Sequence, residues 1–512
     1  MAQEWRDCWL LPAEVALDEL VLRLEKKFTL AADAPVTKQL TYCDSFDWRL
    51  FKAGLVLTCS GTRWIVSAIE SGKTLCADHG PKPTQGLFAK DFGAGVLQDT
   101  LAPLLAIRSL SAVAQATVAS QTFRLLNRDE KTVVRLVVEQ FAVKENDQLL
   151  RIARLEPVRG YVEELNQARK VFKKCTPAAV TPGRFVLEQG SLTSGRVPGA
   201  YTSRFILELD PDQTTFSAIQ TIYKQLLDTI YTNIPGTIAD LDSEFLHDLR
   251  VAIRRTRSGL SLIKNVLPED VVEKYKADFA YLGKITGPAR DMDVYLLYED
   301  EYKKRLPPSL QAGLHTFFEN LAATRIQEQK ALVRELKGAR VEEILSSWGA
   351  YLKEPGEPRG KFAELPVIDI AQKIIFKRYT RVLNDGLAIT KHTSDKEIHR
   401  LRIQGKKLRY AIEFFSSLFP QQDIETAIKR LKRLQNYLGD FNDLSVQQEM
   451  LKKYIGETRP GSRKNLELTA ALGGLMGNLH QQQVKARDDF EAIFSKFSGA
   501  AHTELFEQLF AS

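Results

Sequence analysis

The pattern of hydrophobic and polar positions divides the chain into two regions. From about residue 205 onward, apolar residues recur at helical spacing almost without interruption. Residues 1–175 instead combine two segments with helical spacing, 14–28 and 161–172, with short β-branched runs. Runs typical of strands lie at 55–59, 64–68 and 133–138. The pattern therefore predicts an α+β domain over 1–175, followed by an all-α region.

Prolines and glycines mark the expected boundaries. They are frequent over 176–204, which predicts a linker. Breaks in the helical region are expected at Pro307–Pro308, Pro355–Pro358 and Arg459–Ser462. The second of these separates halves of similar length, 205–354 and 355–512, and each half has room for about four helices of common length. We therefore expect two four-helix bundles.

The two halves share a repeated motif. A histidine followed by cations 3, 7, 8 and 10 residues later occurs at 247–257 and again at 399–409, which is 152 positions further on. A second pair of segments, Gly287–Asp291 and Gly439–Asp443, is separated by the same 152 positions. Two landmarks that share one offset indicate an internal duplication.

Each motif copy is predicted to place its cations along one face of a helix. At about 100° per residue, offsets 0, 3, 7 and 10 fall within an arc of about 80°. The first stripe contains His247, Arg250, Arg254 and Arg257, and Arg255 projects to its other side. The second stripe contains His399, Arg402, Lys406 and Arg409. The adjoining apolar residues are expected to pack against neighbouring helices.

Capping residues precede both helices. Asp242 is the expected N-cap of the first motif helix, and Ser394 with Glu397 forms a capping box before the second.

The stripes carry more positive charge than nearby acids can neutralise. Like charges at such spacings repel one another, and the first motif contains only Asp248 while the second contains no acid. An external polyanion would compensate this charge. The alternative interpretation is a solvated basic face, which is the usual meaning of a run of charges but does not require a repeated pattern.

Composition adds limits to this picture. The 512 residues are 44% hydrophobic and 26% charged, with a net charge of +7, so two or three globular domains with a weak preference for acidic partners are expected. Neither a signal region nor an apolar membrane span is evident, which favours a cytoplasmic protein. The five cysteines form no C-x-x-C pair, so we expect reduced thiols and neither a zinc site nor a cofactor.

The duplicated H-x-x-R-x-x-x-R/K-R/K-x-R pattern resembles the CHAD family, the conserved-histidine α-helical domain. The segments around Gly287–Asp293 and Leu438–Asp443 resemble its second motif, and the resemblance covers about 205–512. It implies two pseudo-symmetric four-helix bundles that bind inorganic polyphosphate in a basic channel without known turnover. It also implies residence on polyphosphate granules in some bacteria.

The resemblance also implies the binding residues. Its phosphate contacts map to His247, Arg250, Arg254, Arg255, Arg257, His399, Arg402, Lys406, Lys407 and Arg409. Neighbouring helices add the further candidates Arg290, Lys377, Arg378 and Arg381. Asp291 and Asp443 are interpreted as structural, either as caps at helix starts or as partners of arginine.

The N-terminal part resembles a CYTH, or triphosphate tunnel, domain, which implies an antiparallel sheet closed into a tunnel. The segment Thr41–Leu55 carries this likeness. The paired acids and bases of that family are mostly missing, since only Glu4 and Glu156 stand where acids are expected and Leu57–Ser60 replaces a basic strand. Triphosphate hydrolysis needs carboxylates for a metal and bases for the phosphates. We therefore expect either a degenerate, non-catalytic relative of that family or a different α+β fold with a chance similarity.

Two other functions compete with polyphosphate binding. A nucleic-acid-binding protein would use the same stripe, but single-strand binders interleave aromatic residues, and only Tyr410 lies near either motif in the sequence. A metal-dependent phosphohydrolase would use His247-Asp248 or the N-terminal domain, yet the second copy has Arg400 in place of the aspartate.

Overall fold

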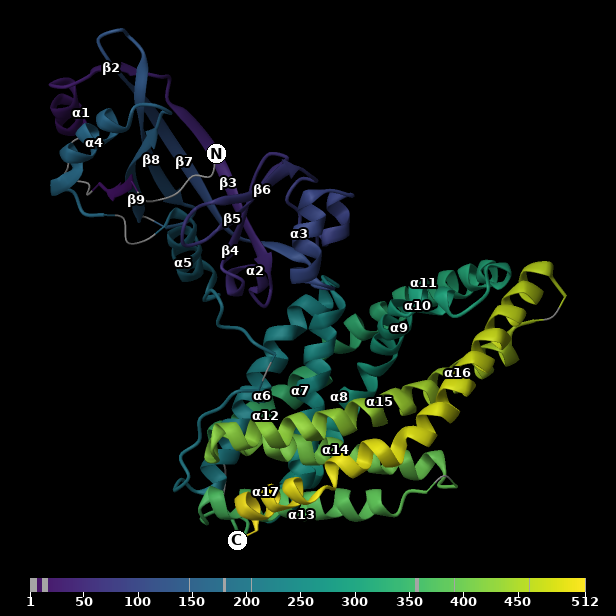
Figure 1. Ribbon diagram of the computed structural model, residues 1–512. Coiled ribbons are helices and arrows are strands. Elements are labelled where there is room, and N and C mark those ends of the chain that lie inside the picture. The colour runs from purple at the N-terminus through teal and green to yellow at the C-terminus, as the bar shows by residue number, and fades with distance from the viewer. Residues whose placement is uncertain are drawn as a thin grey trace. The chain divides into compact units, whose positions relative to one another are not determined.

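The protein is described by a computed structural model that contains two compact units, one up to residue 203 and one from residue 204 onward (Figure 1). The structure describes residues 7–11, 17–146, 148–177, 181–203, 205–354, 359–390, 392–459 and 461–511.

The first unit is built on a nine-stranded sheet in which all the paired strands are antiparallel. The strand order is β1-β9-β8-β7-β3-β4-β5-β6, and β2 pairs with β7. The strands are β1 Cys8–Leu10, β2 Thr29–Ala32, β3 Val36–Ser45, β4 Leu55–Ser60, β5 Arg63–Ala68, β6 Thr74–His79, β7 Leu110–Leu126, β8 Thr132–Val143 and β9 Leu149–Pro157. The three predicted β-branched runs lie in β4, β5 and β8, so these predictions are confirmed.

Helices cover this sheet where its apolar side chains require burial. Helices α1 and α4 pack on β8 and β9 through a core that includes Leu24, Leu136, Leu155 and Leu165. The helical segments of the unit are α1 Leu17–Glu25, α2 Arg49–Lys52, η2 Ala89–Phe92, α3 Val96–Leu105, α4 Val162–Val171, η3 Phe172–Lys174 and α5 Pro182–Ser194. The helix predicted over 161–172 is confirmed as α4. Helix α1 lies within the one predicted over 14–28, whose first residues are outside the described part of the chain.

The predicted linker over 176–204 is wrong for much of its length, because α5 occupies 182–194. Pro182 stands at the first helical position, and the Thr181 hydroxyl accepts a hydrogen bond from the Arg184 backbone N–H. Gly190 of this helix approaches β7 so closely that a Cβ there would lie 2.6 Å from the Ala114 Cβ. Glycine in this segment therefore permits close packing on the sheet.

The second unit is all-helical, as predicted. Its helices are α6 Thr215–Ile238, α7 Ser243–Leu262, α8 Glu269–Ile285, α9 Gly287–Leu297, α10 Glu299–Lys304, α11 Pro308–Leu336, α12 Ala339–Lys353, α13 Val367–Leu387, α14 Asp395–Phe415, η4 Ser416–Leu418, α15 Gln421–Glu457, α16 Arg463–Phe497 and α17 Ala500–Phe510. The expected breaks at 307–308 and 459–462 are confirmed, and the break at 355–358 lies outside the described residues. Among the described helices, none has the length and apolarity that a membrane crossing requires.

The duplication is visible in where the helices start. Helices α13, α14 and α15 each begin 152 residues after α6, α7 and α8, respectively. The copies then diverge. The first copy breaks after Ile285 and continues as the separate helix α9, whereas α15 runs without a break from Gln421 to Glu457.

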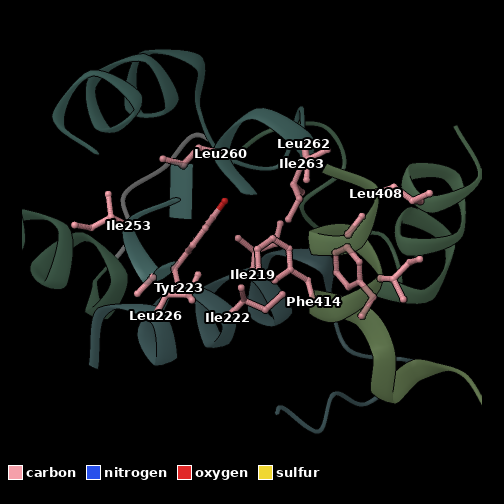
Figure 2. Packing of buried hydrophobic residues seen from close by; sticks show 14 of the residues in the cluster. Ile219, Ile222, Tyr223, Leu226, Ile253, Leu260, Leu262, Ile263, Leu408 and Phe414 are labelled. Carbon is pink, nitrogen blue, oxygen red and sulfur yellow. The ribbon is translucent and has the colours of Figure 1, made fainter. Parts of the chain in front are cut away.

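The two halves share one hydrophobic core, which fixes the position of one half relative to the other. Buried residues of this cluster run from Leu209 to Phe510 and include members of both halves. In Figure 2, Ile219 and Tyr223 of α6 lie in one cluster with Leu408 and Phe414 of α14. A smaller cluster packs α11 against α16. Cations on α7 and α14 are therefore positioned by the same packed interior.

Candidate polyanion-binding cleft

Helices α7 and α14 carry the two motif copies, and both begin as predicted. The Asp242 carboxylate accepts a hydrogen bond from the Glu244 N–H at 3.0 Å at the start of α7. Ser394 and Glu397 form the capping box of α14. The apolar faces of both helices are buried as expected, including Leu249 and Ile253 of α7 and Leu401 and Leu408 of α14. Burial of these faces fixes the direction in which each cationic stripe projects.

Cations from both motif copies line one cavity of about 370 Å³. Its walls come from α7, α9, α14 and α15. The lining residues are His247, Arg250, Arg254, Arg290, Asp291, Val294, Tyr295, Tyr298, Arg402, Asp443, Val446 and Gln447. We refer to this cavity as the cleft. It contains four arginines and two aspartates, so its wall carries more positive than negative charge.

Two of these arginines are held in place by backbone and side-chain oxygens. Arg250 donates from Nη1 to the Gly283 carbonyl at 3.1 Å and to the Thr286 hydroxyl at 3.0 Å. Arg290 donates from Nη1 to the Ser243 carbonyl at 3.2 Å and from Nη2 to His247 Nδ1 at 3.0 Å. Burial lowers the pKa of both guanidinium groups. The charge of Arg254 adds to this effect, whereas Asp291 opposes it at Arg250 and Asp293 opposes it at Arg290. These contacts orient the arginines without neutralising them.

Arg254 lies at the centre of the positive charge. It disfavours the charged forms of Arg250, Arg290 and Lys406, so it faces cations from both halves. Its Nε is buried without a hydrogen-bond partner, and the same is true of Arg402. No ion pair to Arg254 is found among the described residues. Uncompensated charge at a partly buried site is costly, so a bound anion would stabilise it.

Lys406 extends the positive charge of the cleft on the α14 side. It does not line the cavity itself. Burial lowers its pKa to about 8, and the charges of Arg402 and Arg254 add to this effect. Asp443 acts in the opposite direction but does not offset it. The ammonium group would regain its usual basicity if an anion were bound beside it.

The two aspartates of the second motif occupy equivalent positions beside equivalent arginines. Arg402 and Asp443 form an ion pair at 3.6 Å, and the Asp291 charge acts on Arg250, the counterpart of Arg402. The interpretation as arginine partners is confirmed for Asp443. The interpretation as caps at helix starts is wrong, because Asp291 is the fifth residue of α9 and Asp443 lies well inside α15.

Several cations inferred from the motif do not reach the cleft. Arg255 and Arg409 both pair with Glu413, at 2.8 and 2.6 Å. Arg381 pairs with Asp385 on its own helix. His399 is exposed and shares a hydrogen bond with Asn442. Arg257, Lys377, Arg378 and Lys407 are also absent from the lining, and of these Arg257 and Lys377 are exposed.

Two tyrosines that the motif reasoning missed line the cleft. Tyr295 and Tyr298 follow Asp291 at offsets 4 and 7 and project from the end of α9. Burial raises the pKa of Tyr295 to about 12, with further contributions from Asp291 and Asp443. Helical spacing from Asp291 was the available signal. The lining of the cleft therefore combines cationic and aromatic side chains.

A buried arginine of the first unit is engaged by acidic side chains of the same unit. Arg154 pairs with Glu139 at 3.6 Å and also with Glu156. Asp44 is buried and accepts backbone N–H groups of Ser45, Leu50 and Phe51, which is a structural role. Glu4 lies outside the described residues. In the part of the chain that the structure describes, no three His, Cys, Asp or Glu side chains come together as a metal site.

The region that contains the cleft matches a known family of protein domains. Residues 221–452 match the family model of the CHAD domain. The helical unit therefore contains a CHAD domain. The match covers less than half of the chain and leaves the first unit, with its CYTH resemblance, unassigned.

Two solved structures resemble the chain. The CHAD domain from the plant Ricinus communis is 25% identical, with a TM-score of 0.49, and the match covers 59% of this chain and 98% of that one. PptA from Streptomyces chartreusis is 15% identical, with a TM-score of 0.44, and the match covers 55% and 99%, respectively. No curated protein matches the chain.

Within this CHAD domain, the lining of the cleft is rich in cationic hydrogen-bond donors. Guanidinium groups from two duplicated helices present donors at fixed positions, and arginine can contact two oxygens of one anion. The motif residues that reach the cleft are His247, Arg250, Arg254 and Arg402, with Arg290 from the second motif.

Proposed function

We propose that the CHAD domain binds inorganic polyphosphate in the cleft without converting it. The observation that carries the proposal is the convergence of Arg250, Arg254 and Arg402 on one cavity whose lining holds only two aspartates. The family resemblance points to the same ligand. Such binding would recruit the protein to polyphosphate granules in the cytoplasm.

A flexible polyphosphate chain suits this site physically. Each internal phosphate carries about one negative charge, so affinity would come from many ion pairs and from released counterions, as it does for the phosphates of nucleic acids. Affinity should then fall steeply as the salt concentration rises. In a plot of the logarithm of the association constant against the logarithm of the salt concentration, each phosphate contact should contribute about 0.7 to 0.9 to the downward slope.

Calorimetric titration of the full chain with tripolyphosphate and with long-chain polyphosphate tests the proposal. The Arg254→Ala, Lys406→Ala double variant is expected to lose affinity for the long chain by at least about 100-fold, because charge-assisted hydrogen bonds contribute about 1.5 to 3 kcal/mol each. The matched control is Lys453→Ala with Arg463→Ala. It removes the same charge from exposed ion pairs outside the motifs and should bind normally. Equal loss in both variants would refute a defined site.

A nucleic acid is the second candidate ligand, because Tyr295 and Tyr298 line the cationic cleft. Base stacking on an aromatic side chain contributes about 1 to 3 kcal/mol per base. Competition between polyphosphate and single-stranded RNA of equal charge separates the candidates. Preferential RNA binding that is lost in Tyr295→Ala would favour the nucleic acid and overturn the polyphosphate proposal.

We further propose that the first unit is non-catalytic. Support comes from the pairing of Arg154 with Glu139 and Glu156, which engages charges that a triphosphate site would use. Incubation of the protein with tripolyphosphate and Mg²⁺ or Mn²⁺ should release no phosphate. Sustained release that Glu4→Ala or Glu156→Ala abolishes would establish an active triphosphatase instead.

A further inference from the structure

Glu413 connects the two motif helices. It lies near the end of α14, where one carboxylate oxygen accepts from Arg255 Nη2 of α7 at 2.8 Å and the other accepts from Arg409 Nε at 2.6 Å. The side chains of Arg255 and Glu413 are only 11% and 12% exposed, so solvent and salt screen this pair weakly. One carboxylate therefore forms ion pairs with a motif cation from each half.

The connection exists in one half only. The residue 152 positions before Glu413 is Ser261, whose hydroxyl donates to the Arg257 carbonyl on its own helix. Lys407, the counterpart of Arg255, faces the cations Arg378 and Lys276. Of these two equivalent positions, only 413 holds an acid, so the two ends of the cationic surface differ.

The neighbouring residues Arg254 and Arg255 on α7 have different surroundings. Arg254 lines the cleft among other cations, and no ion pair to it is found among the described residues. Arg255, the next residue, is turned toward Glu413 and stacks its guanidinium over the Phe205 ring at 5.6 Å. A phosphate that approached Arg255 would have to displace a carboxylate that is held in place by the fold.

We propose that Glu413 is a specificity-determining residue that ends the anion-binding surface. By occupying Arg255 and Arg409, it confines a bound anion to the cleft and prevents a longer chain from extending along α7 and α14. This inference rests on the proposed polyanion-binding function. It predicts that the carboxylate limits how much additional affinity a long chain gains over a short one.

Glu413→Gln tests the inference, because glutamine keeps the side-chain length but removes the charge. Long-chain polyphosphate should bind on the order of tenfold more tightly to this variant at low salt, and tripolyphosphate about as before. The slope of the logarithm of affinity against the logarithm of salt concentration should steepen by about 0.7 to 1.8 for the long chain, since one or two ion pairs are added. Glu457→Gln is the charge-matched control, because its carboxylate is exposed and pairs within α15.

The outcomes separate the two ideas. Absence of polyphosphate binding by the unaltered protein would refute the proposed function. Normal binding by that protein, with the salt slope and long-chain affinity unchanged in Glu413→Gln, would refute the role of Glu413 alone. If Glu413→Gln does not fold, the binding of long-chain polyphosphate by Arg255→Ala tests the inference instead. Binding should stay within about twofold of normal, and a loss as large as that of Arg254→Ala would overturn the inference.

Discussion

Arg254 and Lys406 occupy equivalent positions in the two motif copies, and the positive charge of Arg254 acts on the Lys406 ammonium group. Burial, followed by the charges of Arg402 and Arg254, lowers the pKa of Lys406 to about 8. Duplication has therefore placed like charges together in the folded protein. Such an arrangement is unfavourable without an anion.

The Arg254→Ala, Lys406→Ala variant should be as stable as the unaltered protein, or slightly more stable, in the absence of ligand. Removing either cation relieves repulsion and the cost of burying charge, which offsets the lost packing of the side chains. Urea unfolding followed by circular dichroism should give a free energy within about 1 kcal/mol of normal or above it. A collapse of the helical signal would mean that these residues hold the fold together.

Arg255→Ala should have the opposite effect on stability. Its ion pair with Glu413 is largely buried, although Glu413 keeps Arg409 as a second partner. We expect a loss of about 1 to 2 kcal/mol in the free energy of unfolding. Arg381→Ala breaks a far more exposed pair with Asp385 and should cost less than about 0.5 kcal/mol. Equal effects in the two variants would argue against a structural role for Arg255.

Affinity for long-chain polyphosphate should decrease as the pH rises through about 8. The anion favours the protonated form of Lys406, whose pKa is lowered to about 8, so binding near this pH takes up a proton. Lys406→Arg remains charged throughout and should remove this dependence. Calorimetry in buffers of different ionisation enthalpy measures the proton uptake. An unchanged pH profile in Lys406→Arg would assign the effect to another group.

The lowered pKa of Lys406 also predicts how the stability of the protein changes with pH. Because Lys406 titrates near 8 in the folded protein and near 10.5 when unfolded, the unfolded chain binds more protons between these values. The stability of the ligand-free protein should therefore receive a contribution that increases with pH across this window. Lys406→Arg should lack this contribution.

Arg290 and Asn442 stand at equivalent positions, 152 residues apart, but should contribute unequally to binding. Arg290 lines the cleft and is oriented by His247 and the Ser243 carbonyl, whereas Asn442 shares a hydrogen bond with the exposed His399. Arg290→Ala should weaken polyphosphate binding by about tenfold or more, and Asn442→Ala by much less. Dissociation constants measured at low salt compare the two. Equal losses would indicate that both half-sites contact the ligand alike.

The local features of the fold could be predicted because short segments encode them. The caps Asp242 and Ser394, the apolar faces of α7 and α14 and the strand-forming run at 133–138 all depend on neighbours within a few residues. The linker prediction failed although Thr181-Pro182 is a typical helix start. The frequency of proline and glycine in this segment predicts a linker. The Thr181 cap and the packing of α5 on β7 instead stabilise a helix there.

Candidate site residues were predicted less completely. Counting acids within the motif copies overlooked Glu413, which follows Arg409 by four residues and neutralises two motif cations. Tyr295 at the end of α9 and Tyr298 directly after it lie outside both motif helices, so the motif spacing does not predict them. Both omissions concern contacts between helices, which periodicity within one helix cannot supply.

The sequence by itself determined that the chain has a strand-rich first part, a duplicated helical second part and two cationic helix faces 152 residues apart. Those are properties of spacing, and spacing is local. Only the tertiary structure decided that Arg254 and Lys406 meet, that Glu413 occupies Arg255 and Arg409, and that His399 remains outside the cleft. The physical reason is that one hydrophobic core spans both halves and fixes how the two motif helices face each other.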